Sequence, residues 1–263
     1  MKLYEANISN TSLKYLKIGK GKPLVYIPSF EGFLHTHSIK ELSKSFEIFI
    51  PLIPGIFNTP KIDGYNSIED LSDLFIEFIE QIEYEKVDLI GYSLGGYLAS
   101  WIAVKKSDII DQIVLISPLG FNLNDKRIEL DKQNFEKLVY KYSDGFEALK
   151  NNENIVTQSH LDLYKYQKLD EKLLEQLSSL KNLTLILIGN DDPIVPSISG
   201  QMIKEKIEHS YFIYVYDSGH GIEIDQPDRV TNLLSDFLMR GQAFIVNWGG
   251  RDETEAPTRE MAN

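Results

Sequence analysis

The sequence predicts an α/β fold in which helices flank a mainly parallel central sheet, with a small helical cap inserted. Short apolar runs of strand length alternate with helical patterns along the chain. Several of these runs are apolar at nearly every position, which is typical of parallel strands buried on both faces. The alternation favours a parallel sheet, because each parallel neighbour needs a crossover connection.

The expected elements follow one another in a regular order. Ser67 has the features of a helix N-cap, with Asp70 three residues later, and Pro227 opens a helix with a one-sided apolar pattern. The expected strands are 2–8, 13–18, 23–27, 46–50, 87–90, 112–116, 183–188 and 211–216, and the expected helices are 36–46, 67–82, 96–104 and one from 227 onward.

Three parts are expected along the chain. Residues 1–121 and 183–240 form the core, since the alternation is confined to them. Residues 122–182 interrupt it with a long, charged and helical stretch, which predicts a cap. Residues 241–263 begin with the apolar run 243–246 and end in a polar mixture. This tail is expected to be an extra strand, a contact in a homo-oligomer or a segment without structure.

Composition excludes several classes of protein. With 263 residues, of which 43% are hydrophobic and 25% charged, the chain suits one globular domain with an insertion. A formal net charge of -12 repels phosphate, so nucleic acid is not an expected partner. The absence of cysteine excludes disulfides, thiolate metal sites and a cysteine nucleophile. No stretch resembles a signal peptide or a membrane span, so we expect a cytoplasmic protein.

Residues 91–95, GYSLG, fit the pattern G-x-S-x-G of a nucleophile elbow. In such an elbow a serine occupies a sharp turn from strand to helix, and the glycines are needed because larger side chains would collide. The pattern lies between the expected strand 87–90 and the expected helix 96–104. This placement predicts Ser93 as a nucleophile, beside helix amides that can stabilise an oxyanion. A glycine-rich turn that only caps a helix is the alternative.

A serine nucleophile needs a nearby base, and the chain offers five histidines. His220 lies directly after the last expected strand, between Gly219 and Gly221, which give the backbone freedom to place the ring. We therefore expect His220 to be the base. His35 and His37 lie two residues apart, but no carboxylate follows them at metal-ligand spacing, so no metal site is expected.

The base in turn needs a carboxylate that fixes its tautomer and stabilises the imidazolium. The loop after the expected strand 183–188 offers two candidates, Asp191 and Asp192, within GNDDPIVP. Both follow the strand at a spacing that suits the role, so the residues by themselves leave the choice open.

Three segments, GYSLGG, GNDDPIVP and SGHGIEIDQPDRV, together resemble the α/β-hydrolase family over about residues 23–238. They occur in the family's order of nucleophile, acid and base. The resemblance implies Asp192, rather than Asp191, as the acid. It also implies an oxyanion hole made by the backbone amides of Leu94 and Phe30, and a reaction without cofactor or metal.

The chain departs from the family pattern at two loops. Pro28 and Ser29 precede Phe30 where family members usually carry histidine and glycine, and Leu52 stands at the aspartate position of an aspartate-x-proline-glycine loop. A serine restricts the backbone more than a glycine does, so the oxyanion loop is expected to differ. Haloalkane dehalogenases and epoxide hydrolases of the family place aspartate at the elbow, and Ser93 argues against both.

The expected function is hydrolysis of a small carboxylic ester through an acyl-enzyme. Hydrolysis of amides, thioesters, lactones or carbon–carbon bonds, perhydrolysis and acyl transfer use the same triad and stay open. A different class also stays open, namely a receptor-like protein that binds a ligand on a hydrolase scaffold. The expected partner is a small-molecule substrate, with aromatic side chains of the cap lining its pocket.

Overall fold

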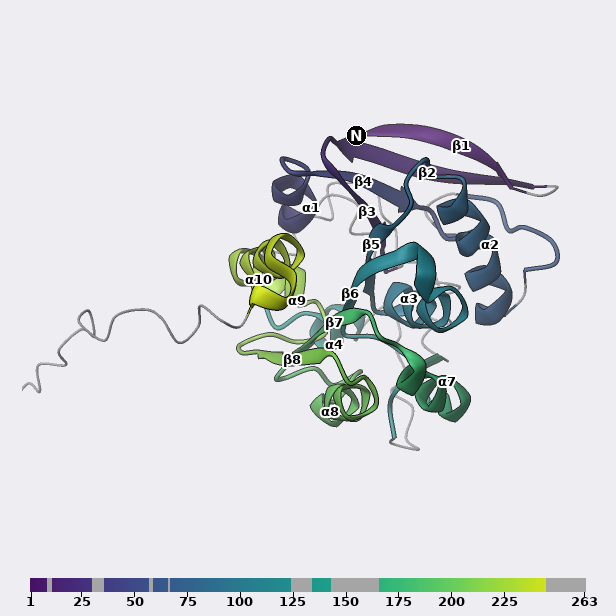
Figure 1. Cartoon of the computed structure of the whole chain (residues 1–263). Helices are drawn as coiled ribbons and strands as arrows, with labels where there is room; N and C mark the ends of the chain where they lie inside the picture. Colours follow the sequence, from purple (N-terminus) through teal and green to yellow (C-terminus); the bar gives the residue numbers. More distant parts are fainter. Residues whose placement is uncertain are drawn as a thin grey trace, which may run out of the picture.

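A computed structural model of the chain describes residues 1–8, 11–29, 36–56, 59–65, 67–123, 134–142 and 166–244. These residues form an eight-stranded sheet with helices on both faces (Figure 1). The strands are β1 (Lys2–Ile8), β2 (Thr11–Gly19), β3 (Lys22–Ile27), β4 (Phe46–Pro51), β5 (Val87–Tyr92), β6 (Ile110–Ile116), β7 (Leu183–Gly189) and β8 (Ser210–Val215).

The strands lie in the order β1-β2-β4-β3-β5-β6-β7-β8. β1, β2 and β4 pair antiparallel, and every later neighbour pairs parallel, which confirms the predicted α/β fold with a mainly parallel sheet. All six residues of β5 are buried. The nearly continuous apolar runs of the sequence therefore correspond to strands covered on both faces.

Helices cover the two faces unevenly. α1 and α10 pack together on one face, whereas α2, α3 and α7 follow one another on the other face, and α8 continues that layer beside α7 (Figure 1). The helices are α1 (His37–Leu42), α2 (Ile68–Glu80), α3 (Leu94–Lys105), α4 (Phe135–Val139), α7 (Glu171–Gln176), α8 (Ser197–Lys206), α9 (Ile222–Asp225) and α10 (Pro227–Arg240), with 3-10 turns η1 (Ser107–Ile109), η3 (Leu177–Ser179) and η4 (Gly241–Phe244).

The start of α2 forms as its local sequence dictates. The Ser67 hydroxyl accepts the N–H of Asp70 at 3.0 Å, and the Asp70 carboxylate accepts the N–H of Ser67 at 3.0 Å. This reciprocal capping box satisfies two amides that the helix itself leaves without partners.

The predicted cap, residues 122–182, lies largely outside the described residues, so the division into core and cap stays a prediction. Within this range α4 is described, and α7 and η3 pack against α3 and α8 of the core layer. Residues 245–263 of the predicted tail are also outside the described part. Its first four residues form η4 and not a strand, and Phe244 packs, buried, against Phe237 and Tyr211.

The topology places three loops at one edge of the sheet. β5, β7 and β8 run parallel, so the turns that follow their carboxyl ends gather on the same side. These turns carry Ser93, Asp192 and His220, the residues singled out from the sequence.

Candidate active site

Ser93 lies in the turn between β5 and α3 and is fully buried. Its φ of 53° and ψ of -114° form a combination that residues with a side chain rarely adopt. Hydrogen bonds on both sides hold this backbone: the N–H of Ser93 donates to the Ile116 carbonyl at 2.8 Å, and its carbonyl accepts from Tyr97 and Leu119, each at 3.1 Å. The turn thus fixes the hydroxyl at the edge of the sheet.

Gly91 and Gly95 lie at the two positions of this turn where the backbone packs too closely for a side chain. A Cβ on Gly91 would lie 2.3 Å from the Gly95 carbonyl oxygen, and a Cβ on Gly95 would lie 2.1 Å from the carbonyl oxygen of Ile27 in β3. Both distances are far below van der Waals contact. The two glycines therefore allow the elbow to close and allow β3 to approach the start of α3.

His220 lies in the loop between β8 and α9 and is fully buried. Its Nε2 is 2.8 Å from Oγ of Ser93, and its Nδ1 is 2.9 Å from Oδ2 of Asp192. Because an ionised carboxylate only accepts hydrogen bonds, Nδ1 donates to Asp192, and Nε2 is left to accept the Ser93 proton. The hydroxyl of Tyr92 in β5 donates to the His220 carbonyl at 3.0 Å and steadies the loop.

Asp192 uses both of its carboxylate oxygens. Oδ2 faces His220, while Oδ1 accepts the N–H groups of Ile194 at 2.8 Å and Val195 at 2.9 Å. These bonds fix the direction of the carboxylate. The side chain of Asp191 is instead 46% exposed and pairs with Lys141. The structure therefore brings Asp192, and not Asp191, into contact with the histidine.

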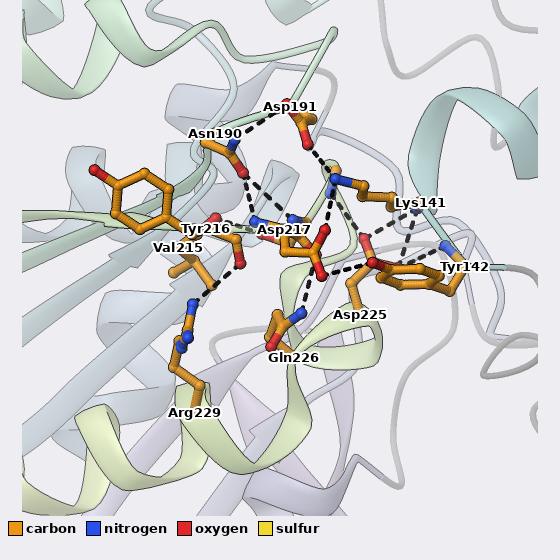
Figure 2. A network of polar contacts seen from close by, with 12 residues as sticks. Lys141, Tyr142, Asn190, Asp191, Val215, Tyr216, Asp217, Asp225, Gln226 and Arg229 are labelled. Atoms are coloured by element: carbon orange, nitrogen blue, oxygen red, sulfur yellow. Dashed lines mark hydrogen bonds and ion pairs between the residues drawn. The ribbon is translucent and has the colours of Figure 1, made fainter. Parts of the chain in front are cut away.

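A polar network at the surface joins two loops (Figure 2). One is the acid loop, which follows β7 and carries Asp192, and the other is the base loop, which follows β8 and carries His220. The ammonium of Lys141 lies 2.5 Å from the Asp191 carboxylate and 2.7 Å from the Asp217 carboxylate. The side-chain oxygen of Asn190 accepts the N–H of Asp217 at 2.7 Å. Since Asn190 and Asp191 follow β7 and Asp217 follows β8, these contacts set the spacing of the two loops.

Asp225 ties the residues after α4 to the base loop, as Figure 2 also shows. Its carboxylate accepts the N–H groups of Gly219 at 2.8 Å, Lys141 at 3.1 Å and Tyr142 at 3.2 Å. Burial raises the pKa of Asp225, and these backbone hydrogen bonds partly offset the rise. The carboxylate thus organises backbone amides next to His220 without contacting the ring.

The segment that includes Tyr140 also packs directly on the loop that carries His220. The N–H of Gly221 donates to the Val139 carbonyl at 2.7 Å. A Cβ on Gly221 would lie 2.4 Å from the Tyr140 ring, so the ring occupies the space that a side chain would need. Residues at the end of α4 therefore contribute to the wall beside His220.

The oxyanion side of the site is described in part. Leu94 is the first residue of α3, so its N–H has no acceptor within the helix and lies at the positive end of the helix dipole. Phe30 lies outside the described residues, and its role stays a prediction. Ser29 is buried, and its hydroxyl has no hydrogen-bond partner among the described residues. Its φ is not positive, so serine occupies this position without left-handed strain.

Sequence reasoning missed three polar residues around the triad, namely Lys141, Asp225 and Glu223. The pairs they form join distant parts of the chain: Lys141 and Asp191 are 50 positions apart, and Tyr26 and Glu223 are 197 apart. No local spacing marks such pairs. The one available signal was the presence of two acids within five residues after His220.

Neither a metal cluster nor a membrane helix is found in the part of the chain that the structure describes. No group of three or more His, Asp or Glu side chains there is arranged to hold a metal ion. None of the helices described is both long and apolar enough to cross a bilayer.

Comparison with known families identifies the class of protein that this fold and site represent. Residues 22–163 match the family model of the alpha/beta hydrolase fold. The match covers more than half of the 263 residues, and it includes the elbow at Ser93. The chain belongs to the α/β-hydrolase fold family.

Individual relatives are distant. The chain is 23% identical over 252 residues to 2-hydroxy-6-oxo-2,4-heptadienoate hydrolase of Pseudomonas putida, covering 84% of this chain and 90% of that protein. A meta-cleavage product hydrolase from Pseudomonas fluorescens superimposes with a TM-score of 0.76 at 23% identity, covering 90% and 97% of the two chains. A thermophilic esterase from Thermogutta terrifontis gives 0.73 at 18% identity, covering 91% and 98%. The two solved structures establish the fold, and the names of the relatives support a hydrolase.

Proposed function

We propose that the chain is a serine hydrolase that cleaves small carboxylic esters through a Ser93–His220–Asp192 triad. One observation carries the proposal: Nε2 of His220 is 2.8 Å from the serine hydroxyl, and its Nδ1 is 2.9 Å from the Asp192 carboxylate. All three residues are buried, in a place where hydrogen bonds to charged groups are stronger than in water. This geometry suits proton transfer from serine to histidine.

The proposed reaction proceeds in two halves. Ser93 Oγ attacks the ester carbonyl carbon while Nε2 of His220 takes the hydroxyl proton, and Asp192 stabilises the imidazolium that forms. The oxyanion accepts the N–H of Leu94, together with that of Phe30 in the proposed hole. As the carbonyl re-forms, the alkoxide leaves with the proton from Nε2. Water then attacks the acyl-enzyme by the same route and releases the acid.

Hydrolysis of a carbon–carbon bond is the second candidate. The observation that favours it is the similarity to two hydrolases. One is the 2-hydroxy-6-oxo-2,4-heptadienoate hydrolase of Pseudomonas putida, and the other is the meta-cleavage product hydrolase of Pseudomonas fluorescens. Such a bond breaks only if the departing carbon can carry the electron pair, so the substrate must supply that stabilisation. An ester needs no such help, which is why we place it first.

The test compares the wild-type chain with Ser93→Ala. Both are incubated with a fluorophosphonate probe, and then assayed with activated esters of graded chain length and with 2-hydroxy-6-oxo-2,4-heptadienoate. We expect labelling and ester turnover in the wild type only, with a loss of about 10⁵-fold or more in kcat for Ser93→Ala. Preferential cleavage of the dienoate would favour the second candidate.

Three further outcomes count against the proposal. Equal turnover by Ser93→Ala would refute Ser93 as the nucleophile, and no Ser93-dependent labelling together with no turnover would refute the enzyme proposal. Labelling without appreciable turnover, combined with a ligand that raises the melting temperature, would favour the receptor-like alternative.

A further inference from the structure

Glu223 is a buried acid close to the triad that the proposed reaction does not use. It lies in α9, three residues after His220, and is 1% exposed. Burial raises the pKa of its carboxyl group. No lysine, arginine or histidine among the described residues forms an ion pair with it. A buried carboxyl without a cation is costly, so its hydrogen-bond partners are the feature to explain.

The carboxyl group accepts hydrogen bonds from the hydroxyls of Tyr26 and Thr36, and the Ser38 hydroxyl of α1 also interacts with it. Oε2 accepts the hydroxyl of Tyr26 in β3 in a short contact, and Oε1 lies 3.3 Å from the hydroxyl of Thr36. Thr36 is the N-cap of α1, where its oxygen also accepts the N–H of Ile39 at 3.2 Å. Glu223 therefore joins the segment that carries His220 to both β3 and the start of α1.

The end of β3 is also in contact with the nucleophile elbow. A Cβ on Gly95 would lie 2.1 Å from the Ile27 carbonyl oxygen and 2.8 Å from that of Pro28. Tyr26 is the residue directly before Ile27. A shift of β3 relative to α9 would thus change the fit between the elbow and the residues that follow β3.

We infer that Glu223 is a positioning residue that holds the end of β3 and the start of α1 against the segment carrying His220. The inference rests on the proposed function, because its effect is exerted on the Ser93–His220 pair and the adjoining oxyanion side. A leucine of similar size could fill the same space. It would offer no acceptor to the Tyr26 and Thr36 hydroxyls, and so could not fix the three elements in one arrangement.

The test uses Glu223→Leu, Glu223→Gln and Tyr26→Phe in the full chain. Glutamine keeps an acceptor and adds a donor of the same reach, so it should restore the arrangement. Active sites are titrated with the fluorophosphonate probe, so that kcat for an activated ester refers to folded enzyme only. Asp88→Leu is the matched control, since it removes another fully buried carboxyl, near the amino end of β5 and away from the triad.

We expect Glu223→Leu to lower kcat per titrated site about 100-fold, as small misplacements of catalytic groups do, with a much smaller change in KM. Tyr26→Phe should lower kcat about tenfold, which corresponds to the loss of about one hydrogen bond. Glu223→Gln should stay within about threefold of the wild type. Asp88→Leu should lower the melting temperature and leave kcat per site unchanged.

Three results would overturn the inference: an unchanged kcat per site in Glu223→Leu, a Glu223→Gln variant as slow as Glu223→Leu, or an equal loss in Asp88→Leu. Should Glu223→Leu fail to fold, Tyr26→Phe decides alone, because it leaves the carboxyl in place. If the wild type shows no Ser93-dependent labelling, the proposed function itself fails. Normal labelling of the wild type with unaffected variants refutes only the role of Glu223.

Discussion

At the carboxyl edge of the parallel strands, Asp192 and Glu223 are buried against imidazole, amide and hydroxyl groups, whereas at the amino edge Asp88 is buried against an ammonium group. Lys22 Nζ lies 2.9 Å from the Asp88 carboxylate and also 2.9 Å from Asp111. Burial raises the pKa of Asp88 to about 6 in spite of this partner.

The partners of the buried acids differ in function between the two ends of the parallel strands. The Lys22 ammonium beside Asp88 keeps its positive charge near neutral pH, so this ion pair serves the fold and cannot relay a proton. An imidazole beside Asp192 can gain and lose a proton while the carboxylate stays in place, which is what a base in acyl transfer requires. The two edges should therefore respond differently to removal of an acid.

The largest expected difference comes from Asp192→Asn compared with Asp191→Asn. Asparagine at 192 cannot stabilise an imidazolium and favours the wrong tautomer, so kcat should fall about 10⁴-fold. Asparagine at 191 loses the exposed ion pair with Lys141 but keeps an oxygen that can accept the Asn190 amide, so it should change kcat less than about threefold. Steady-state kinetics on an activated ester measures both, and the opposite pattern would assign the acid to Asp191.

Asp88→Asn should affect stability with pH but leave catalysis alone. The pKa of Asp88 is about 6 in the folded chain against 3.8 for the free group, so the folded state holds a proton that the unfolded state releases between these values. This group therefore lowers the free energy of unfolding as pH rises through that window.

Relative to Asp88→Asn, the wild type should lose about 2 kcal/mol of unfolding free energy between pH 4 and pH 7, measured by urea denaturation. The kcat per active site should be equal in the two proteins. A difference in stability that is independent of pH, or a slower Asp88→Asn enzyme, would remove the contrast between the two edges.

Lys141→Met should have the smallest effect. Its partners Asp191 and Asp217 are 46% and 56% exposed, and exposed ion pairs contribute little because water and salt screen them. We expect about a twofold loss of kcat at low salt that disappears in about 1 M NaCl, where screening is nearly complete. Lys181→Met, which removes an exposed pair with Glu208, is the control and should leave kcat unchanged. A tenfold loss that persists in salt would show that Lys141 has a larger role.

Features encoded by neighbouring residues were predictable from the sequence. The Ser67 and Asp70 capping box, the buried central strands and the strand–turn–helix around Ser93 all depend on local spacing, and the structure contains each of them. The approach of Asp192 and His220 to Ser93 follows from parallel strands that end at the same edge. The choice between Asp191 and Asp192 could not be made from the residues alone, because it depends on which way a loop directs each side chain.

Features that join distant residues were not predictable. Glu223 contacts Tyr26 and Thr36 only because α9 folds against β3 and α1, and no spacing in the sequence predicts that contact. The same holds for Asp225, whose partners Lys141 and Tyr142 belong to the region after α4. For the tail, the sequence left an extra strand, a contact in a homo-oligomer and a segment without structure open. Its residues up to Phe244 form a 3-10 turn, in which Phe244 is buried against Phe237 of α10.

The most direct test of the account is to trap the acyl-enzyme. Wild-type protein is mixed with an activated ester, quenched in acid within the first turnover, digested and analysed by mass spectrometry. We predict an acyl group on the peptide containing Ser93, at a level that matches the burst of released alcohol, and no adduct in Ser93→Ala. Turnover without an adduct on that peptide, or an adduct on another residue, would contradict the assignment of Ser93 as the nucleophile.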